Sequence, residues 1–300
     1  NRAKYDGSGE NSAGIPNAEG SGIEVCGDPC GMTCSPKSMT YEFFAQTDRG
    51  RVRANNEDAV TVDRDTQVAI LADGMGGYNA GEVASGMAIT FIRTEMNRWL
   101  VQAGPEPSST DVRRALELCV ENANHAILGA SLSNPQYAGM GTTLVVGVFQ
   151  GNRLILGHIG DSRCYRLRAG VLQQITRDHS WLQEQVDAGI LTREQAAASS
   201  SRNLVTRALG VEPNVQMEVN EFQVAPSDLF VMCSDGLTDM VNDDDLAQLM
   251  RTPVPLEEKA ALLIDTANAH GGRDNVSVLL VQAAAGGKKR SLMARLLGAA

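Results

Sequence analysis

The order of its segments most constrains the fold of this 300-residue chain: strand-like runs follow one another directly, and helical segments come in pairs between them. A doubly wound parallel sheet requires strict alternation of strands and helices, which this sequence does not have. The order instead favours antiparallel sheets packed in layers with helices outside, in one domain.

The expected elements follow from apolar periodicity and from turn residues. Strands are predicted over residues 41–47, 59–63, 68–71, 142–149, 153–159, 164–167, 215–224, 229–233 and 276–281. Helices are predicted over residues 81–100, 110–132, 243–250 and 256–269, while residues 180–200 turn helical and polar. Thr110 is the predicted N-cap of the second helix, and Gln150-Gly151-Asn152 predicts a hairpin turn.

Both ends of the chain differ in composition from its middle. Residues 1–38 are rich in Gly, Ser, Asn and Pro, which predicts a flexible leader. Residues 286–300 form a short basic amphipathic tail, either solvated or able to dock on a partner or an anionic membrane. The folded domain is therefore expected over residues 39–285.

The charge of the chain limits its partners. Its 36 acidic and 26 basic residues give a formal net charge of −10, which disfavours broad contact with nucleic acid. Bound cations reverse the field locally, so an acidic chain can still handle phosphate if it holds metal. The sequence has neither a signal peptide nor an apolar run of about 18 residues. We therefore expect a cytoplasmic monomer without a transmembrane segment.

The six cysteines fall into two groups. Three lie among apolar residues and are interpreted as reduced core thiols: Cys119, Cys164 and Cys233. The other three lie in the leader: Cys26, Cys30 and Cys34. Their spacing is not a usual zinc pattern, and a redox or metal site there is the alternative to an unstructured segment.

Four acidic motifs stand at the boundaries of predicted strands. They are Arg53-Ala-Asn-Asn-Glu57-Asp58, Asp73-Gly74-Met75-Gly76-Gly77, Ser234-Asp235-Gly236 and Arg273-Asp274-Asn275. A carboxylate at the rim of a sheet is costly unless it is paired or bound to a cation. Oxygen ligands without His or Cys favour Mg²⁺ or Mn²⁺ over zinc, and a glycine can offer its carbonyl. Each Asp-Gly pair alone is also a common turn, so the set as a whole carries the metal hypothesis.

In chain order, these motifs resemble the metal-dependent serine/threonine protein phosphatases of type 2C, most closely their bacterial branch. The matching segments are Thr47–Arg53, Asn56–Asp58, Ala72–Gly77, Gly81–Ser85, Gly141–Thr143, Gly157–Arg163, Thr176–Ser180, Ala208–Gly210, Cys233–Leu237 and Arg273–Val276. The resemblance spans residues 41–283, and the ordered set is specific although each motif is short.

The resemblance implies an α+β fold, a four-layer α-β-β-α sandwich of two antiparallel sheets flanked by pairs of helices. Its metal site would lie at one end and hold two cations, Mn²⁺ or Mg²⁺. Asp73 would bridge both cations, and the Gly74 carbonyl would bind one of them. Asp235 and Asp274 would bind the other.

The resemblance also implies supporting roles around these ligands. Glu57 and Asp58 would hold metal-bound waters, and Asp161 would share a third, weaker cation with Asp235. Arg53 would grip the substrate phosphate, because a planar guanidinium matches phosphate oxygens in a fork. Together with Asp73 and Asp235, Arg53 is a predicted catalytic residue.

The implied reaction is hydrolysis of phosphoserine and phosphothreonine by direct attack of a metal-bridging water. No cysteine nucleophile is needed, and Cys233 is interpreted as a core residue. Met75 stands where many eukaryotic relatives have a histidine proposed as general acid, so the proton donor to the leaving group is open. His179 is a candidate for a catalytic role, whereas His158 is interpreted as a satisfied core residue. Residues 180–205 match a variable flap beside the active site.

The predicted partners are phosphorylated proteins and a cognate bacterial serine/threonine kinase. Two other readings stay open at the level of sequence. One is a catalytically silent phosphatase fold that binds phosphoproteins as a regulator, and the other is a hydrolase of a different phosphoester, such as a nucleotide.

Overall fold

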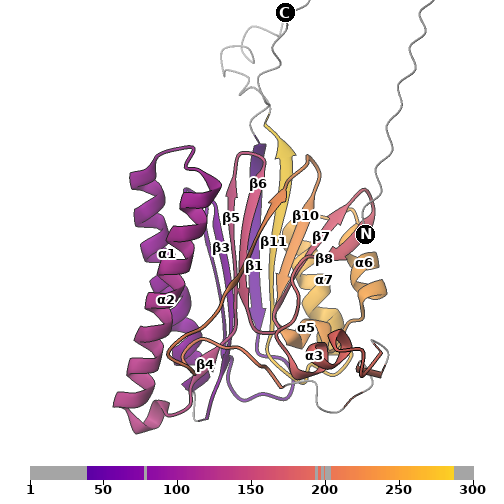
Figure 1. Ribbon diagram of the computed structural model, residues 1–300. Coiled ribbons are helices and arrows are strands. Elements are labelled where there is room, and N and C mark those ends of the chain that lie inside the picture. The colour runs from indigo at the N-terminus through magenta and orange to yellow at the C-terminus, as the bar shows by residue number, and fades with distance from the viewer. Residues whose placement is uncertain (1–38, 78–79, 193–194, 197–198, 200–203, 287–300) are drawn as a thin grey trace, which may run out of the picture. The chain divides into compact units, whose positions relative to one another are not determined.

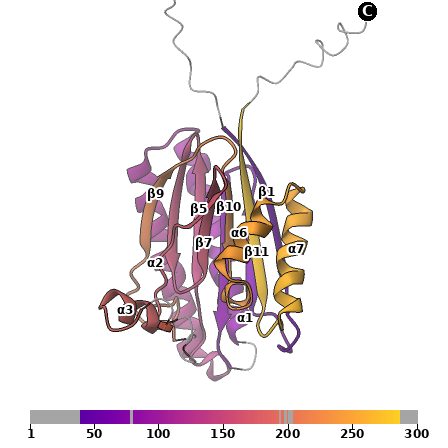
Figure 2. The same cartoon turned by 90° about the vertical axis from the view of Figure 1, so that its right-hand side faces the viewer.

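The computed structural model describes residues 39–77, 80–192, 195–196, 199 and 204–286, all of which belong to one unit, Lys37–Ala300. The predicted leader and all but the first residue of the predicted tail lie outside the described residues. Two antiparallel sheets lie between two layers of helices (Figures 1 and 2). The predicted α-β-β-α arrangement is therefore confirmed.

Each sheet is antiparallel throughout. The first sheet has the order β1 (Met39–Asp48), β11 (Val276–Ala285), β10 (Leu229–Cys233), β7 (Arg163–Arg168), β8 (Val171–Gln174). The second has the order β2 (Asp58–Asp63), β3 (Val68–Met75), β5 (Leu144–Gln150), β6 (Arg153–Ile159), β9 (Glu218–Gln223), with β4 (Gly141–Thr142) paired to β3. The turn between β5 and β6 contains Gly151, as the hairpin prediction required.

The helices cover the outer faces of the two sheets. On the second sheet lie α1 (Ala80–Ala103) and α2 (Ser109–Ser133), followed by the short 3₁₀ turn Pro135–Tyr137. On the first sheet lie α6 (Asp243–Arg251) and α7 (Leu256–Ala269), next to the single turn α5 (Asp235–Thr238). A further short helix, α3 (Trp181–Asp187), follows β8 in the chain.

Alternation along the strands sorts side chains into three apolar layers. In β3, Ile70 packs toward α1 and α2, whereas Leu71 faces the other sheet. In β10, Val231 packs toward α6 and α7, and Phe230 lies between the sheets. Both faces of each sheet are therefore apolar over much of their length, and polar groups gather where the strands end.

Three local predictions need correction. β3 continues to Met75 because its last residues pair with β4, so Asp73 and Gly74 lie inside the strand rather than after it. The N-cap of α2 is Ser108, not Thr110, because the Ser108 Oγ accepts the N–H of Asp111 at 3.1 Å.

The third correction concerns short strands. The strand predicted over residues 215–224 begins only at Glu218, where pairing with β6 starts. β8 was not predicted, and β4 was not separated from the strand predicted over residues 142–149, which the structure begins as β5 at Leu144. β4 has two residues and β8 has four, which is too few for an apolar period to stand out.

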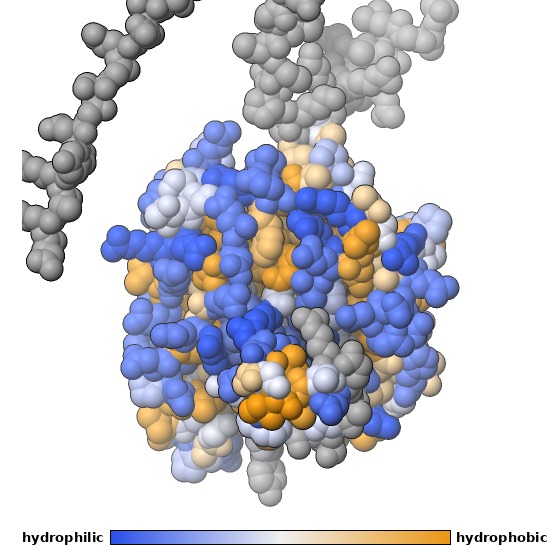
Figure 3. All heavy atoms as spheres, turned by 45° about the vertical axis from the view of Figure 1, so that its right-hand side comes forward, coloured by the Kyte–Doolittle hydropathy of each residue, from blue (hydrophilic) through white to orange (hydrophobic). Residues whose placement is uncertain are grey.

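Cys119, Cys164 and Cys233 are buried and unoxidised, as predicted. Burial raises the pKa of the Cys119 thiol to about 11 and that of Cys233 to about 12, which suppresses the reactive thiolate. None of the helices in the described part of the chain combines the length and apolar character that a bilayer crossing requires. Hydrophilic side chains cover most of the face shown in Figure 3.

Candidate metal centre

Two neighbouring strands of the second sheet bring the first pair of aspartates together. Asp58 opens β2 and is paired in register with Asp73 near the end of β3. The Asp73 N–H donates to Thr143 Oγ1 (3.0 Å), and the Thr142 hydroxyl donates to the Asp73 carbonyl (2.9 Å). The sheet itself therefore fixes the position of Asp73.

The first sheet supplies the second pair of aspartates. Asp235 begins α5 directly after β10, and Asp274 stands two residues before β11. Arg53 Nη2 donates to Asp274 Oδ2 at 2.6 Å, and the Arg53 side chain is 50% exposed. The predicted phosphate-gripping residue thus lies at the edge of the acidic group, held by one of its members.

A serine links the two sheets at this end. The Ser234 hydroxyl donates to Asp58 Oδ2 at 2.8 Å, although 176 residues separate them in the chain. The Ser234 hydroxyl oxygen also accepts the Ser277 N–H from β11 at 3.0 Å. Ser234 is fully buried, so the link holds Asp58 against the end of β10.

Close backbone packing accounts for both Asp-Gly pairs. The Gly74 N–H donates to the Glu57 carbonyl at 3.1 Å, and a Cβ added at Gly74 would lie 2.1 Å from the Gly81 carbonyl oxygen. A Cβ at Gly236 would lie 2.0 Å from the Asn275 carbonyl oxygen. No side chain fits at either position, so these glycines are needed for packing rather than for tight turns.

Asp161 reaches the same end from the loop between β6 and β7. Gly160 precedes it with a φ of 101°, a conformation that favours glycine. The Ser162 Oγ lies 2.8 Å from Thr143 Oγ1, the atom that also accepts the Asp73 N–H. Thr143 therefore connects the loop of Asp161 with the strand of Asp73.

The carboxylates of this end raise one another's pKa. Burial, and then the charges of Asp58 and Asp235, raise the pKa of Asp73 well above its usual range. Burial, and then the charge of Asp161, raise the pKa of Asp235 well above its usual range. Burial is also the main cause that raises the pKa of Asp58 and of Asp161 to about 6. Like charges held away from water are costly, so this end of the molecule favours an added cation.

The donor atoms fit hard divalent cations, because all of them are oxygens. Asp58 Oδ1 is buried and has no hydrogen-bond partner among the described residues. Within the same residues, no three of these carboxylates bring one oxygen each to within 4.8 Å of one another. A cation here would therefore need further ligands, which Mg²⁺ ordinarily takes from water.

A second group of possible metal ligands comes from β6, β9 and the segment before α3, but its geometry does not suit a metal ion. Oxygen or nitrogen atoms of His158, His179 and Glu218 lie within 4.8 Å of one another. The two imidazoles are stacked, with centroids 4.5 Å apart and planes at 15°. Their lone pairs lie in the ring planes, so stacked rings do not converge on one ion. His158 is instead satisfied by the Arg177 carbonyl at 2.7 Å, and His179 by the Gly160 N–H at 3.1 Å.

The predicted flap, residues 180–205, begins and ends at one place. Ser180 and Val205 form an antiparallel bridge, and the Trp181 N–H donates to the Leu204 carbonyl at 2.9 Å. The Thr206 N–H donates to the His179 carbonyl at 2.8 Å. His179 thus supports the base of this segment, and it has no contact here that assigns it a catalytic role.

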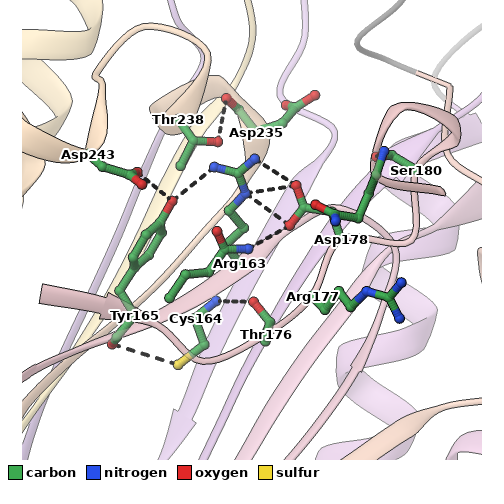
Figure 4. A network of polar contacts seen from close by, with 12 residues as sticks. Arg163, Cys164, Tyr165, Thr176, Arg177, Asp178, Ser180, Asp235, Thr238 and Asp243 are labelled. Carbon is green, nitrogen blue, oxygen red and sulfur yellow. Dashed lines mark hydrogen bonds and ion pairs between the residues drawn. The ribbon is translucent and has the colours of Figure 1, made fainter. Parts of the chain in front are cut away.

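A partly buried ion pair anchors the segment leading into the predicted flap. Arg163 binds Asp178 through Nε (3.0 and 2.9 Å) and Nη2 (2.6 Å), and its Nη1 donates to the Tyr165 hydroxyl at 2.9 Å (Figure 4). The Tyr165 hydroxyl donates in turn to Asp243 at the start of α6. Arg163 lies two residues after Asp161, so this network holds β7 in place beside the Asp161 loop.

Two residues of this end were not assigned roles from sequence. Asn275 accepts the Glu57 N–H at 2.8 Å and donates to the carbonyls of Arg49 and Asn55, both at 2.9 Å. It thereby ties the loop of Arg53 and Glu57 to Asp274, and its place beside Asp274 was the available signal. Asp239 lies one turn after Asp235, and its charge raises the pKa of both Asp235 and Asp161. The helical spacing Asp-x3-Asp was the available signal.

Comparisons with known proteins agree with this geometry. Residues 46–267 match the family "Protein phosphatase 2C". The chain is 37% identical over 247 residues to the serine/threonine phosphatase stp of Listeria monocytogenes, covering 81% of this chain and 96% of that one. It is 40% identical over 246 residues to the phosphatase PstP of Mycobacterium tuberculosis, covering 81% of this chain and 45% of the relative.

Solved structures agree as well. The crystal structure of the Mycobacterium tuberculosis phosphatase PstP/Ppp has a TM-score of 0.73 at 39% identity, over 81% of this chain and 98% of that chain. The PstP catalytic domain in complex with two manganese ions has a TM-score of 0.73 at 38% identity, over 82% and 100%. The chain belongs to the protein phosphatase 2C family. Within it, the chain is a serine/threonine phosphatase of the bacterial type.

Proposed function

We propose that this chain hydrolyses phosphoserine and phosphothreonine in proteins with the help of two divalent cations, Mn²⁺ or Mg²⁺, held at its acidic end. Asp73 would contact both cations, and the Gly74 carbonyl would bind one. Asp235 and Asp274 would bind the other. The supporting observation is that aspartates from both sheets gather here with pKa values raised by burial and by one another.

Further residues would complete the centre. Glu57 and Asp58 would hold water ligands, and the unpartnered Asp58 Oδ1 is suited to this role. Asp161 would share a third, weaker cation with Asp235, and Asp239 is placed to assist them. The predicted flap, 180–205, would border the centre, because its base at His179 contacts Gly160, next to Asp161.

Bound divalent cations would neutralise the phosphate dianion and lower the pKa of a water poised for in-line attack. Arg53 would bind phosphate oxygens through guanidinium donors that Asp274 does not use, and this contact would orient the phosphorus. Burial of the aspartates keeps their repulsion strong when no cation is present, so cation binding would relieve it. Met75 offers no proton, so the leaving alkoxide would take its proton from solvent.

Metal dependence tests this proposal directly. The full chain is expected to hydrolyse p-nitrophenyl phosphate and phosphothreonine peptides with Mn²⁺ or Mg²⁺, and excess EDTA should abolish turnover. Saturating Mn²⁺ at about 100 times its Kd should also stabilise the fold by about 2.7 kcal/mol. Asp73→Ala should lose both effects, whereas full turnover in EDTA would contradict the proposal.

The relatives carry phosphatase names, and the silent-regulator reading is not favoured beside them. We further propose a cognate serine/threonine kinase, because a phosphatase of this type needs phosphorylated proteins as substrates. The monomeric state and the cytoplasmic location stay predictions. Sedimentation of the full chain would decide the first, and fractionation of cells the second.

A further inference from the structure

Most arginines in the described part of the chain have a partner for their side chain. Arg49 donates to the Ala54 carbonyl, Arg53 to Asp274 and Arg168 to Asp228. Three arginines have neither an ion pair nor a side-chain hydrogen bond among the described residues: Arg51, Arg114 and Arg273. All three are exposed. Two of them, Arg51 and Arg273, lie beside the candidate metal centre.

Arg51 and Arg273 flank the same glycine turn. The Arg51 N–H donates to the Gly272 carbonyl at 2.7 Å, and a Cβ added at Gly272 would lie 2.9 Å from Arg51 Cγ. The first carbons of the Arg51 side chain therefore pack against Gly272. Arg273 follows directly, with its Cγ 3.8 Å from the Cβ position of Gly271. Asp274 comes next in the chain, and it is the residue that binds Arg53.

Arg53 thus binds Asp274, while Arg51 contacts Gly272 and Arg273 precedes Asp274 in the chain, on a protein whose net charge is −10. Arg53 forms an ion pair with Asp274 and, in the proposed function, also binds the phosphate that is hydrolysed. The charges of Arg51 and Arg273 have no carboxylate within 4.0 Å among the described residues. Exposed cations beside a binding site attract anionic groups that the substrate carries outside the site.

We infer that Arg51 and Arg273 form a second anion-recognition element, which selects phosphoproteins with an acidic group close to the hydrolysed phosphoserine or phosphothreonine. The group would be an Asp or Glu carboxylate or a second phosphate. Both offer oxygens to a guanidinium, and phosphate carries more charge. This inference rests on the proposed function and adds the class of substrate to it.

Binding of non-hydrolysable peptides tests the inference independently of turnover. The probes are peptides with a phosphonate analogue of phosphoserine, flanked by Ala, Asp, a second phosphonate or Lys. Their Kd values for the Mn²⁺-loaded full chain are measured by fluorescence anisotropy. We expect the Asp-flanked peptide to bind about 10-fold more tightly than the Ala-flanked one at low salt, since each exposed pair contributes a few-fold. The preference should shrink in about 0.5 M salt.

Variants then assign the preference to these residues. Arg51→Ala with Arg273→Ala should bring the Asp-to-Ala ratio of Kd values to about one, and each single variant should lower it about 3-fold. Arg51→Glu with Arg273→Glu should reverse the preference toward the Lys-flanked peptide. Arg114→Ala, an exposed arginine in α2 that also has no partner, is the matched control and should keep the wild-type ratio.

Several outcomes would overturn the inference. A wild-type ratio of one, or a ratio that persists in the double variant, would remove the two arginines from recognition. An equal loss of affinity for all peptides in the double variant would show that the two arginines only make the electrostatic potential of the site more positive and do not recognise the flanking residue. Turnover of p-nitrophenyl phosphate by the wild-type chain is measured in parallel, and its absence would contradict the proposed function without deciding the binding ratio. Comparison of the Asp and phosphonate flanks identifies which anion is preferred.

Discussion

The two ends of strand β10 place aspartates in opposite surroundings. Asp228, just before the strand, is 1% exposed and paired with Arg168 at 2.7 and 2.5 Å. It also accepts the Ala225 N–H at 2.8 Å. Asp235, just after the strand, lies among Asp161, Asp274 and Asp58, and burial with these charges raises its pKa.

The difference separates a carboxylate that is compensated within the protein from one that we propose binds a cation. A buried carboxylate with a guanidinium partner is compensated inside the protein and needs nothing from solution. A group of carboxylates that raise one another's pKa is compensated only by a proton or an added cation. Residue type alone would not distinguish the two ends of β10, and the more deeply buried aspartate, Asp228, is the one with a guanidinium partner.

The largest expected effect is on catalysis. Asp235→Asn should lower kcat/KM for a phosphothreonine peptide by more than about 100-fold, because it removes a proposed cation ligand, and loss of an outer-shell partner alone costs about 10- to 100-fold. Asp228→Asn is the matched control from the other end of the strand and should retain turnover. If both variants lose a comparable factor in kcat/KM at a temperature where both are folded, the proposed difference in role between Asp228 and Asp235 is wrong.

The same two variants should change stability in opposite directions. Asp228→Asn should lower the free energy of unfolding by about 2 kcal/mol, since it leaves Arg168 without its counter-charge. In EDTA at neutral pH, Asp235→Asn should raise it by about 1 kcal/mol, because one of several repelling charges is removed. Urea denaturation of both variants provides the measurement. Destabilisation of the metal-free protein by Asp235→Asn would mean that the carboxylate is already compensated.

The smallest effect concerns pH. The pKa of Asp58 and of Asp161 is about 6 in the folded state, against an ordinary 3.8. Their contribution to stability is fully present below about pH 4 and is lost as the pH rises through about 6. Each of the two carboxyl groups should therefore make the metal-free protein about 1 kcal/mol less stable at pH 7.5 than at pH 5, and Asp58→Asn should remove the part of this dependence that Asp58 contributes. Rising stability over this range in EDTA would contradict the shift.

Sequence patterns located the long elements because their signals are local. Helix α7 and strand β10 have the predicted bounds, 256–269 and 229–233. The cap of α2 was wrong by two residues, since Ser108-Ser109-Thr110 offers three similar candidates and only hydrogen bonding selects Ser108. Strand β3 was predicted too short, because its last residues are held by β4, a partner about 70 residues away in the chain.

The centre itself was reachable from sequence only as a set of motifs. Composition and spacing gave acidic groups at strand ends, and the family resemblance supplied their convergence. The contacts that bring them together, such as Ser234 with Asp58, join residues far apart in the chain and have no local periodicity. Asp239 was missed for a related reason: its role depends on a neighbour in space, Asp161, rather than on its own motif.

The division of the aspartates between the two sheets has a consequence for how activity arises during synthesis. Asp58 and Asp73 belong to one sheet, and Asp235 and Asp274 become available only when the last third of the chain has been made. If these aspartates act together as proposed, a chain that ends before Asp235 would contain only two of the four. Such a chain would not dephosphorylate proteins before its synthesis reaches the first sheet's last two strands.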